Sequence, residues 1–168
     1  MCIRDRCKKR SIKLKLKIIG DGKFRSQLEG QAAQLGVNNS VKFLGKLPSG
    51  ESVRDELLKA DLFVLASHGE GLPRSMIEAM ACSLPCIGSN ASGIPELLHG
   101  DDLVAPGDAQ ALADKIEGII TNPERMRLMA QRNYKKSLEY KSDILMERRK
   151  KFYKVLRKRT GEWLEDKD

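Results

Sequence analysis

The sequence predicts an α/β fold, a mainly parallel sheet with helices on both faces, followed by a C-terminal helical extension. Strand-like and helix-like segments alternate from residue 14 to residue 105, which is the pattern of parallel strands joined by crossover helices. The strand-like runs are almost continuously apolar, as in strands covered on both faces. From Asp108 onward only helical periodicity remains.

The elements can be placed in order along the chain. The first strand-like run, LKLKIIG, ends at a Gly-Asp-Gly turn, and the helical spacing after it stops at Gly36. Pro73 suits the first turn of a later helix, because its missing N–H would be unpaired there. The expected elements are strand 14–20, helix 24–36, strand 41–45, helix 52–60, strand 62–67, helix 74–82, strand 85–89, a helical turn at 94–98, a short strand at 102–105, and helices at 111–122, 123–140 and around 144–156.

The chain is expected to divide into four parts. Residues 1–12 match no element of the fold and are predicted to be a non-native or disordered lead. Residues 13–121 form one α/β domain, residues 122–160 form the C-terminal helices, and residues 161–168 form a tail. A chain of 168 residues is long enough for one domain with a substantial core, which buries roughly 70% of its unfolded surface.

The distribution of charge argues against nucleic-acid binding. The net charge is +8, but residues 1–17 contribute +7 and residues 141–168 contribute +4, whereas residues 18–140 carry −3. A nucleic-acid site needs a basic stripe on the folded body, interleaved with aromatic residues, and aromatics are only 5% here. No apolar run approaches the roughly 18 residues of a membrane helix, so the composition predicts a soluble globular protein.

The termini and cysteines favour a cytoplasmic location. The opening MCIRDRCKKR lacks the apolar segment and cleavage site of a secretory signal. Cys82 and Cys86 flank a helix-to-strand turn among apolar neighbours, where a free cysteine behaves as a small hydrophobe. The four cysteines form no metal-ligand set with His68 and His99. We therefore expect no disulfide and no metal site built from these cysteines and histidines.

The run RRKK at residues 148–151 lies in the last predicted helix. A solvated helix face is the simplest interpretation, and the alternative is an anionic membrane surface, on which a basic amphipathic helix can lie. The alternative would place the protein peripherally at the inner membrane. The apolar stripe of the same helix consists of Ile144, Leu145, Phe152, Val155 and Leu156.

Candidate binding residues lie in the loops that follow the strands, because open parallel sheets bind ligands beyond the carboxyl ends of their strands. Gly20 and Gly22 of the first loop permit close approach of a ligand to the backbone. Arg25 stands where a dinucleotide fingerprint needs its third glycine, so NAD binding is not expected. Lys46 and Leu47 belong to the second loop.

The third loop, GEGLPRSMIE at residues 69–78, is the most informative. The backbone N–H groups of Leu72, Arg74 and Ser75 at the start of a helix predict an anion site, most naturally for phosphate. Glu70 and Glu78 would flank the bound anion without coordinating it. Because carboxylates accept hydrogen bonds, the groups beyond the anion should be donors, and sugar hydroxyls meet that requirement.

The ordered set IIGDG, FLGKLP, ADLFVLAS, EGLPRSMIEAMACSLPCIG, GIPELL and VAPGDAQALADKI closely resembles a known family. It is similar to the C-terminal donor-binding domain of retaining glycosyltransferases with the Rossmann-like GT-B fold, in the family 4, group 1 type. The likeness covers residues 14 to about 121. Residues 70–78 match the E-x7-E motif of that family, which is a weak pattern alone and a strong one within the ordered set.

The resemblance assigns roles to the candidate residues. It implies that Glu70 holds sugar hydroxyls, that Glu78 holds the ribose diol, and that the amides after Gly71 hold the pyrophosphate. It likens the loop at Lys46 and Leu47 to the base-contacting loop of the family. It implies a nucleotide-diphosphate sugar as donor, an N-terminal acceptor-binding domain as partner, and no essential metal.

The sequence also departs from the family pattern. The strand and helix upstream of residue 14, which carry an Arg and a Lys that clamp the pyrophosphate, are absent, as is the acceptor-binding domain. Ser83 occupies a turn position where glycine is usual, and Ala91 and Ser92 replace part of a common Gly-Gly pair. The fold is expected to tolerate these changes, whereas donor affinity is the property at risk.

The expected function is the donor-binding half of a hexosyltransferase that retains the anomeric configuration, and this chain alone is expected to be inactive. A nucleotide-sugar epimerase of the same fold and a non-catalytic interaction domain are the alternatives. At the level of residues, Glu70 could be a helix N-terminal acid favoured by the dipole, and Glu78 and Arg74 could be solvated helix residues. His68 fits a surface loop better than a general base.

Overall fold

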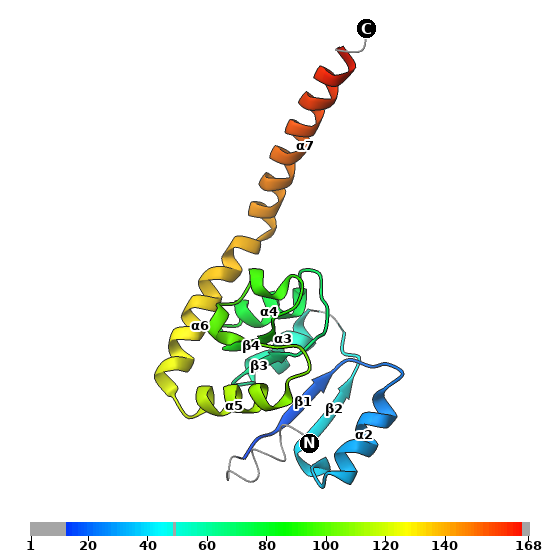
Figure 1. Ribbon diagram of the computed structural model, residues 1–168, viewed down its shortest axis with the longest axis vertical. Coiled ribbons are helices and arrows are strands. Elements are labelled where there is room, and N and C mark those ends of the chain that lie inside the picture. The colour runs from blue at the N-terminus through cyan, green and yellow to red at the C-terminus, as the bar shows by residue number, and fades with distance from the viewer. Residues whose placement is uncertain (1–12, 49, 166–168) are drawn as a thin grey trace.

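The strands and helices follow one another in the predicted order in the computed structural model, which describes residues 13–48 and 50–165 (Figure 1). The lead predicted for residues 1–12 lies outside the described residues. The strands are β1 (Leu16–Ile19), β2 (Val41–Gly45), β3 (Phe63–Leu65), β4 (Cys86–Ser89) and β5 (Leu103–Val104). The helices are α2 (Arg25–Gln34), α3 (Glu51–Leu58), α4 (Arg74–Ala81), α5 (Ala109–Ile120), α6 (Pro123–Ser137) and α7 (Ser142–Glu165), and the 3₁₀ turns are η1 (Asn38–Ser40), η2 (Ile94–Glu96), η3 (Gly100–Asp102) and η4 (Leu138–Tyr140).

The strands form two parallel sheets instead of the single sheet that the sequence predicts. One sheet has the order β1-β2 and the other has the order β3-β4-β5. Within the described residues, no strand pairing joins β1 to β3. In a doubly wound sheet the first strand lies between the second and the fourth, and the resemblance places that strand upstream of residue 14. The described strands of the two sheets therefore follow the order of a doubly wound sheet, with its central strand not among them.

Helices cover both faces of the β3-β4-β5 sheet, as the sequence predicts. Phe63 and Leu65 of β3 pack against one core cluster, and Val64 between them packs against the other. Cys86 and Ile87 of β4 alternate in the same way. The first cluster, formed with α3, α4 and η2, includes Leu57, Met76, Met80, Ile94, Leu97 and Leu98. The second cluster, formed with α5 and α6, includes Val104, Leu112, Ile116, Ile119 and Met129.

The unit formed by β1, α2 and β2 buries far fewer side chains. Leu16 on β1 is 48% exposed, and Phe24 just before α2 is 58% exposed. The buried positions among residues 13–48 are Ala32, Val37 and Gly45. The helix and the two strands therefore contribute little to the core of the molecule.

A salt bridge connects this unit to the rest of the fold. Lys17 Nζ on β1 lies 2.7 Å from Glu56 Oε2 on α3. The hydrogen bond from Lys17, with a second from Lys59, lowers the pKa of Glu56 to about 2, so the carboxylate stays ionised at neutral pH. Leu14 also packs against the second core cluster, as Leu62 does.

The two cysteines predicted for the core differ in burial. Cys86 on β4 is buried, and burial raises the pKa of its thiol to about 12. Cys82 at the end of α4 is half-buried, packs against the first cluster, and also has a pKa raised by burial. Both thiols therefore stay protonated at neutral pH. Cys2 and Cys7 lie outside the described residues.

Two serines have left-handed backbone conformations, at the positions where the family resemblance expects glycine. Ser83 has φ +59° and Ser92 has φ +48°. Ser83 follows the C-cap of α4, its N–H donates to the carbonyl of Met80, and the N–H of Leu84 donates to the carbonyl of Ala79. Helices commonly end in this way with a glycine at the left-handed position, because a Cβ there is strained.

Ser83→Gly is therefore expected to raise the free energy of unfolding by about 0.5–1 kcal/mol. The relief of about 1–2 kcal/mol of left-handed strain exceeds the extra entropy that glycine loses on folding. Urea unfolding followed by circular dichroism measures the change. Ser52→Gly, in the first turn of α3, is the matched control and should not stabilise the protein, because Ser52 has no left-handed conformation to relieve and glycine has a low helix propensity. A loss of stability in Ser83→Gly would contradict the strain assignment.

α7 is a single helix that projects from the body of the molecule (Figure 1). It continues to Glu165, so residues 161–165 are helical instead of forming the predicted tail. Phe152 and Leu156 on the predicted apolar stripe are 59% and 42% exposed. Among the described residues, no helix combines the length and the apolar character needed to cross a membrane.

Backbone amides across residues 141–160 are expected to exchange with solvent faster than those across residues 62–88. α7 has few buried contacts to hold it closed, whereas β3, α4 and β4 enclose the first core cluster. Hydrogen exchange read by mass spectrometry compares the two segments within one sample. Equal protection of both segments would show that α7 is held by contacts other than those described.

Candidate functional site

The carboxyl ends of β3 and β4 position Glu70. The hydroxyl of Ser67, which follows β3, donates a hydrogen bond to Glu70 Oε1 at 3.1 Å. The buried hydroxyl of Ser89, the last residue of β4, donates a short hydrogen bond to the carbonyl of Ser67. Two neighbouring strand ends thus fix the loop and orient a half-buried carboxylate. The sequence analysis missed both serines, although each stands at or just after a strand end.

The start of α4 provides unpaired backbone donors beside Glu70. Pro73 is the N-cap residue, with φ −74° and ψ 108°, and α4 begins at Arg74, so the prediction that Pro73 lies in the first turn was one residue off. Within the described part of the chain, the backbone N–H groups of Leu72, Arg74 and Ser75 have no hydrogen-bond partner. Arg74 and Ser75 are exposed. These N–H groups and the helix dipole favour an anion at this position.

Gly93 contacts the loop that carries Glu70 and Gly71. It was not predicted as a site residue. Its N–H donates to the carbonyl of Glu70 at 3.0 Å. A Cβ built on Gly93 would lie 2.1 Å from the carbonyl oxygen of Gly71, which no real structure tolerates. The absence of a side chain at Gly93 therefore lets the glutamate loop pack directly on the turn before η2.

Gly93→Ala is expected to weaken nucleotide binding about tenfold or more. The methyl group must displace the backbone at Gly71, and the loss of one hydrogen bond to a charged group has an effect of that size. Isothermal titration calorimetry with a nucleoside diphosphate measures the loss. Gly100→Ala is the matched control, because a Cβ there meets no atom within 4 Å and affinity should not change. Unchanged affinity in Gly93→Ala would separate this turn from the site.

Glu78 lies one helical turn beyond Arg74 on α4. Both side chains are exposed, while Met76, Ala79 and Met80 on the other side of the helix are buried in the first core cluster. The structure therefore holds Glu78 at a fixed helical position and leaves its carboxylate accessible. The sequence predicted that the two glutamates bracket the start of a helix, and they do so.

The predicted residues of the first two loops lie at the carboxyl ends of β1 and β2. Gly20 has φ +130°, a conformation that favours glycine, and its N–H donates to the carbonyl of Gly45 at 2.8 Å. Gly22 and Lys46 are exposed, and Leu47 is half-buried. Within the described residues, no hydrogen bond or ion pair joins this group to Glu70 or Glu78.

The side chain of Arg25 lies close to Gly45, at the carboxyl end of β2. Its Nη1 is 3.1 Å from a Cβ built on Gly45, and it pairs with Asp21 at 3.2 Å and, through Nε, with Glu29 at 2.9 Å. These two carboxylates raise the pKa of Arg25. The sequence analysis used Arg25 only to exclude a dinucleotide fingerprint. The structure shows that the side chain also covers the end of β2.

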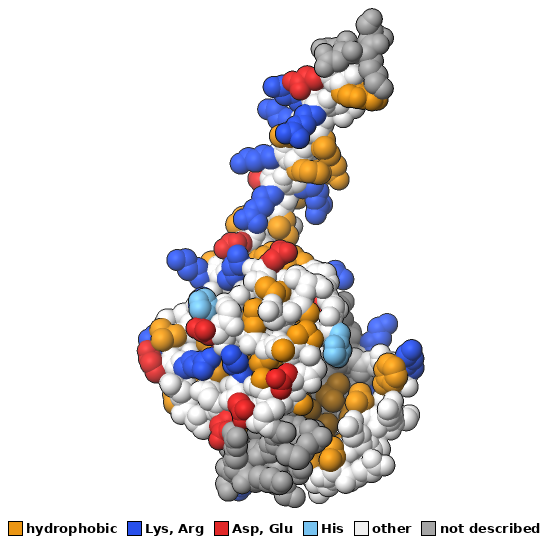
Figure 2. All heavy atoms as spheres, in the orientation of Figure 1, with side chains coloured by type: hydrophobic (Ala, Val, Ile, Leu, Met, Phe, Trp, Pro, Cys, Tyr) orange, Lys and Arg blue, Asp and Glu red, His pale blue; other side chains and the backbone are white. Residues whose placement is uncertain are grey.

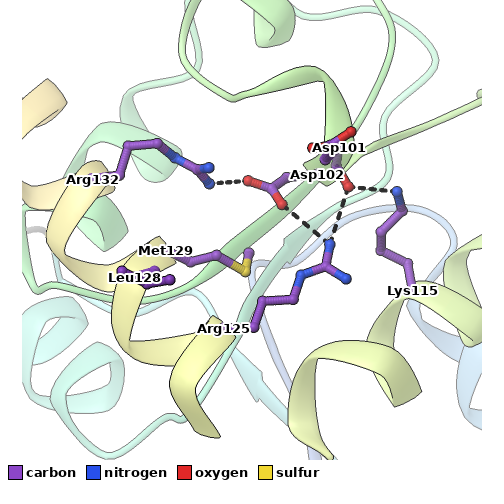
Figure 3. A pocket seen from close by; sticks show the side chains of 7 residues that line it. All are labelled: Asp101, Asp102, Lys115, Arg125, Leu128, Met129 and Arg132. Atoms are coloured by element: carbon purple, nitrogen blue, oxygen red, sulfur yellow. Dashed lines mark hydrogen bonds and ion pairs between the residues drawn. The ribbon is translucent and has the colours of Figure 1, made fainter. Parts of the chain in front are cut away.

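A separate hollow of about 430 Å³ lies between η3, α5 and α6 (Figure 3). The carboxylate of Asp102, whose side chain is 2% exposed, pairs with Arg125 at 3.6 Å and with Arg132. Lys115 Nζ donates to the carbonyl of Asp101 at 2.5 Å. All three cationic side chains therefore interact with oxygen atoms of η3, and these interactions connect η3 to α5 and α6. We therefore assign the hollow a structural role and place the candidate site at the strand ends.

Within residues 13–48 and 50–165, no group of three His, Cys, Asp or Glu side chains could hold a metal ion. His68, the histidine of the glutamate loop, is exposed, and its ring lies 3.3 Å from a Cβ built on Gly107 in the loop after β5. The candidate site thus consists of backbone donors, two carboxylates and glycine turns. Such a site suits an anion with hydroxyl groups attached.

Residues 3–136 match the sequence profile of the family described as glycosyl transferases group 1. The chain belongs to this glycosyl transferase family. The match extends beyond residues 14–121, which carry the resemblance seen in the sequence. The parallel strands flanked by helices correspond to the C-terminal domain of the GT-B fold.

Two bacterial relatives each match more than half of this chain. The chain is 36% identical over 121 residues to N-acetyl-alpha-D-glucosaminyl L-malate synthase of Bacillus anthracis, a match that covers 70% of this chain and 31% of the synthase. It is 41% identical over 105 residues to the amylovoran biosynthesis glycosyltransferase AmsK of Erwinia amylovora, which covers 57% of this chain and 26% of AmsK. The chain thus spans less than a third of either relative.

Two solved structures have the same fold as this chain. HepE of Anabaena in complex with UDP-glucose superposes with a TM-score of 0.73 and 25% identity, over 84% of this chain and 40% of HepE. The C-terminal domain of LpcC, a group 1 glycosyl transferase of Francisella tularensis, superposes with a TM-score of 0.64 and 29% identity, over 71% of this chain and 63% of the LpcC chain.

Proposed function

We propose that this chain is the donor-binding half of a glycosyltransferase that uses a nucleotide-diphosphate sugar. The observation that carries the proposal is the start of α4, where unpaired backbone N–H groups lie beside a carboxylate oriented by Ser67. HepE, a structural neighbour, binds UDP and UDP-glucose. In this proposal the pyrophosphate binds at Leu72, Arg74 and Ser75.

The two glutamates have different roles in the proposal. Glu70 accepts hydrogen bonds from hydroxyls of the transferred sugar, and Glu78 accepts them from the ribose diol. Ser67 donates to one oxygen of Glu70, which leaves the other oxygen available to the sugar. Lys46 and Leu47 contact the base, and Gly20 and Gly22 let the ligand approach the backbone.

The chemistry is the transfer of a hexose to an acceptor hydroxyl with retention at the anomeric carbon. Negative charge develops on the leaving diphosphate as the glycosidic bond breaks. Donors that are already oriented toward that charge stabilise the transition state without reorganisation. The start of α4 supplies such donors, so the proposal needs no metal ion for this step.

The acceptor site belongs to a second domain in the proposal. The chain spans 31% of the N-acetyl-alpha-D-glucosaminyl L-malate synthase and 40% of HepE. An N-terminal domain, opposite the start of α4, would bind the acceptor and close over the donor. The proposal places the enzyme in the cytoplasm.

Binding of nucleoside diphosphates tests the proposal. Thermal unfolding is followed with nucleoside diphosphates of each base, with their glucose conjugates, and with nucleoside monophosphates as controls. A ligand at 100 times its dissociation constant adds about 2.7 kcal/mol of stability, so a specific donor should raise the melting temperature clearly. If no diphosphate stabilises the protein at millimolar concentration, the donor assignment is overturned.

A further inference from the structure

Ser92 lies between β4 and η2, in the turn on which the glutamate loop packs. The N–H of Asn90, at the start of the turn, donates to the carbonyl of Val104 on β5 at 2.7 Å. The N–H of Gly93, at its end, donates to the carbonyl of Glu70 at 3.0 Å. The turn is therefore attached both to the sheet and to the glutamate loop. These attachments give a side chain in the turn a fixed position relative to Glu70.

Ser92 has a strained backbone conformation. Its φ is +48°, a region where a Cβ is strained and glycine is favoured. Within residues 13–48 and 50–165, the hydroxyl of Ser92 has no hydrogen-bond partner. The side chain thus costs stability, and the protein itself gains no hydrogen bond from it. Residues held in such conformations cluster at ligand sites, where the side chain has a role in binding.

The hydroxyl of Ser92 lies beside the segment that leads into Glu70. Its Oγ is 3.7 Å from a Cβ built on Gly69. The unpaired N–H groups of Leu72 and Arg74 belong to the segment that follows Glu70 and begins α4. Ser92 and the anion-binding donors are therefore associated with opposite ends of the glutamate loop, with Glu70 between them.

The surroundings of Ser92 suit an uncharged ligand group. Residues 67–71 and 89–93, which form the loop and the turn, contain no Lys or Arg. In Figure 2 the basic side chains, in blue, are most crowded along the projecting helix α7. A serine hydroxyl both donates and accepts hydrogen bonds, which is what a sugar hydroxyl requires of its partner.

We propose that Ser92 is a specificity-determining residue that forms a hydrogen bond with a hydroxyl group of the transferred hexose. This role rests on the proposed function, because it requires a donor whose diphosphate binds at the start of α4 and whose sugar reaches Glu70. Glu70 and Ser92 then hold the sugar from two neighbouring segments, one after β3 and one after β4. A glycine at residue 92 relieves the strain and loses this contact.

Ser92→Gly and Ser92→Ala are expected to weaken the binding of the sugar conjugate by about threefold to tenfold, the effect of one uncharged hydrogen bond. Affinity for the free diphosphate should change less than twofold, because the diphosphate does not reach residue 92. Calorimetry on the 168-residue chain measures both affinities. The probes are UDP and UDP-glucose, which HepE binds, or the diphosphate and glucose conjugate of whichever base stabilises the chain most in thermal unfolding.

Stability and affinity should change in opposite directions in Ser92→Gly. Its melting temperature should rise, because the left-handed strain is relieved, whereas Ser92→Ala keeps the strain and should melt close to the parent chain. Ser83→Gly is the matched control. It relieves the same kind of strain at the opposite end of β4, so it should raise the melting temperature and change neither affinity.

The outcomes distinguish the role of Ser92 from the donor site as a whole. Unchanged affinity for the conjugate in both Ser92 variants, with the diphosphate still bound, would overturn the role and leave the donor site in place. A loss in only one variant would trace the effect to the backbone or to packing, and equal losses for both ligands would place the hydroxyl at the diphosphate. Either result would overturn the sugar contact. If the parent chain binds neither ligand, the proposed function fails and the role of Ser92 fails with it.

Discussion

Glu78→Gln is expected to weaken the binding of both a nucleoside diphosphate and its sugar conjugate by roughly tenfold to a hundredfold. The proposed partner of Glu78 is the ribose diol, which is present in both ligands. A hydrogen bond to a charged group contributes about 1.5–3 kcal/mol, which corresponds to that range. Glu78 is exposed on the outer side of α4, so the substitution should leave the core and the stability unchanged.

Glu70→Gln is expected to act on the sugar conjugate alone. Its proposed partner is the transferred sugar, so the free diphosphate should keep its affinity within about a factor of three. The hydrogen bond from Ser67 to Glu70 fixes the carboxylate, and an amide can still accept that bond. The loop should therefore keep its conformation in this variant.

Calorimetry with both ligands and both variants separates the two roles. Glu147→Gln, a substitution of the same chemistry on α7, is the control and should change neither affinity. If the 168-residue chain binds too weakly, a longer form that carries the upstream strand and helix serves for the titration. An equal loss of diphosphate affinity in both site variants would mean that Glu70 only shapes the loop.

The 168-residue chain alone is expected to transfer no sugar above the rate of a control without enzyme. The start of α4 is open to solvent, with Arg74 and Ser75 exposed and Leu72 45% exposed. Transfer requires a second surface that positions the acceptor and excludes water from the reacting carbon. The candidate site supplies one surface only.

Release of the nucleoside diphosphate from several nucleotide sugars, with and without simple acceptors, measures this expectation. A longer form with the N-terminal domain provides the positive control. Product release by the short chain without any acceptor would favour the epimerase or hydrolase type of chemistry. Efficient transfer by the short chain would refute the two-domain proposal.

The order and type of the elements were predictable, because apolar periodicity and glycine punctuation are local signals. Strand 41–45 was predicted with its observed bounds, and the helix predicted at 74–82 ends at Ala81. The predicted first strand is longer than observed, since β1 spans Leu16–Ile19. Strand ends depend on pairing with a neighbour, which a local pattern does not contain.

The split of the sheet was not predictable from periodicity. The alternation of strand-like and helix-like segments indicates parallel strands with helices on both faces of the sheet. The order of the strands, however, is set by contacts between segments distant in the sequence. The extent of α7 has a related cause. The sequence analysis ended the helices at residue 160, whereas α7 continues through Gly161 to Glu165, because a glycine stops a helix only where a left-handed turn follows.

The candidate site was predicted in part. The glutamates, the glycine loops and the helix start are sequence motifs, so they could be recognised. The supports of Glu70 are contacts between segments more than 20 residues apart, namely Ser89 with Ser67 and Gly93 with Gly71. Serine at a strand end and glycine in a turn are common, so only the folded structure distinguishes these two residues.

The division into two sheets has a consequence for how the chain unfolds. A domain with one shared core melts in a single all-or-none step, whereas a segment with few buried side chains opens on its own. Residues 16–45 form such a segment, held to α3 by the solvent-accessible pair of Lys17 and Glu56. Denaturant should release this segment at lower concentration than β3, β4 and β5, so two midpoints instead of one free energy would describe the chain.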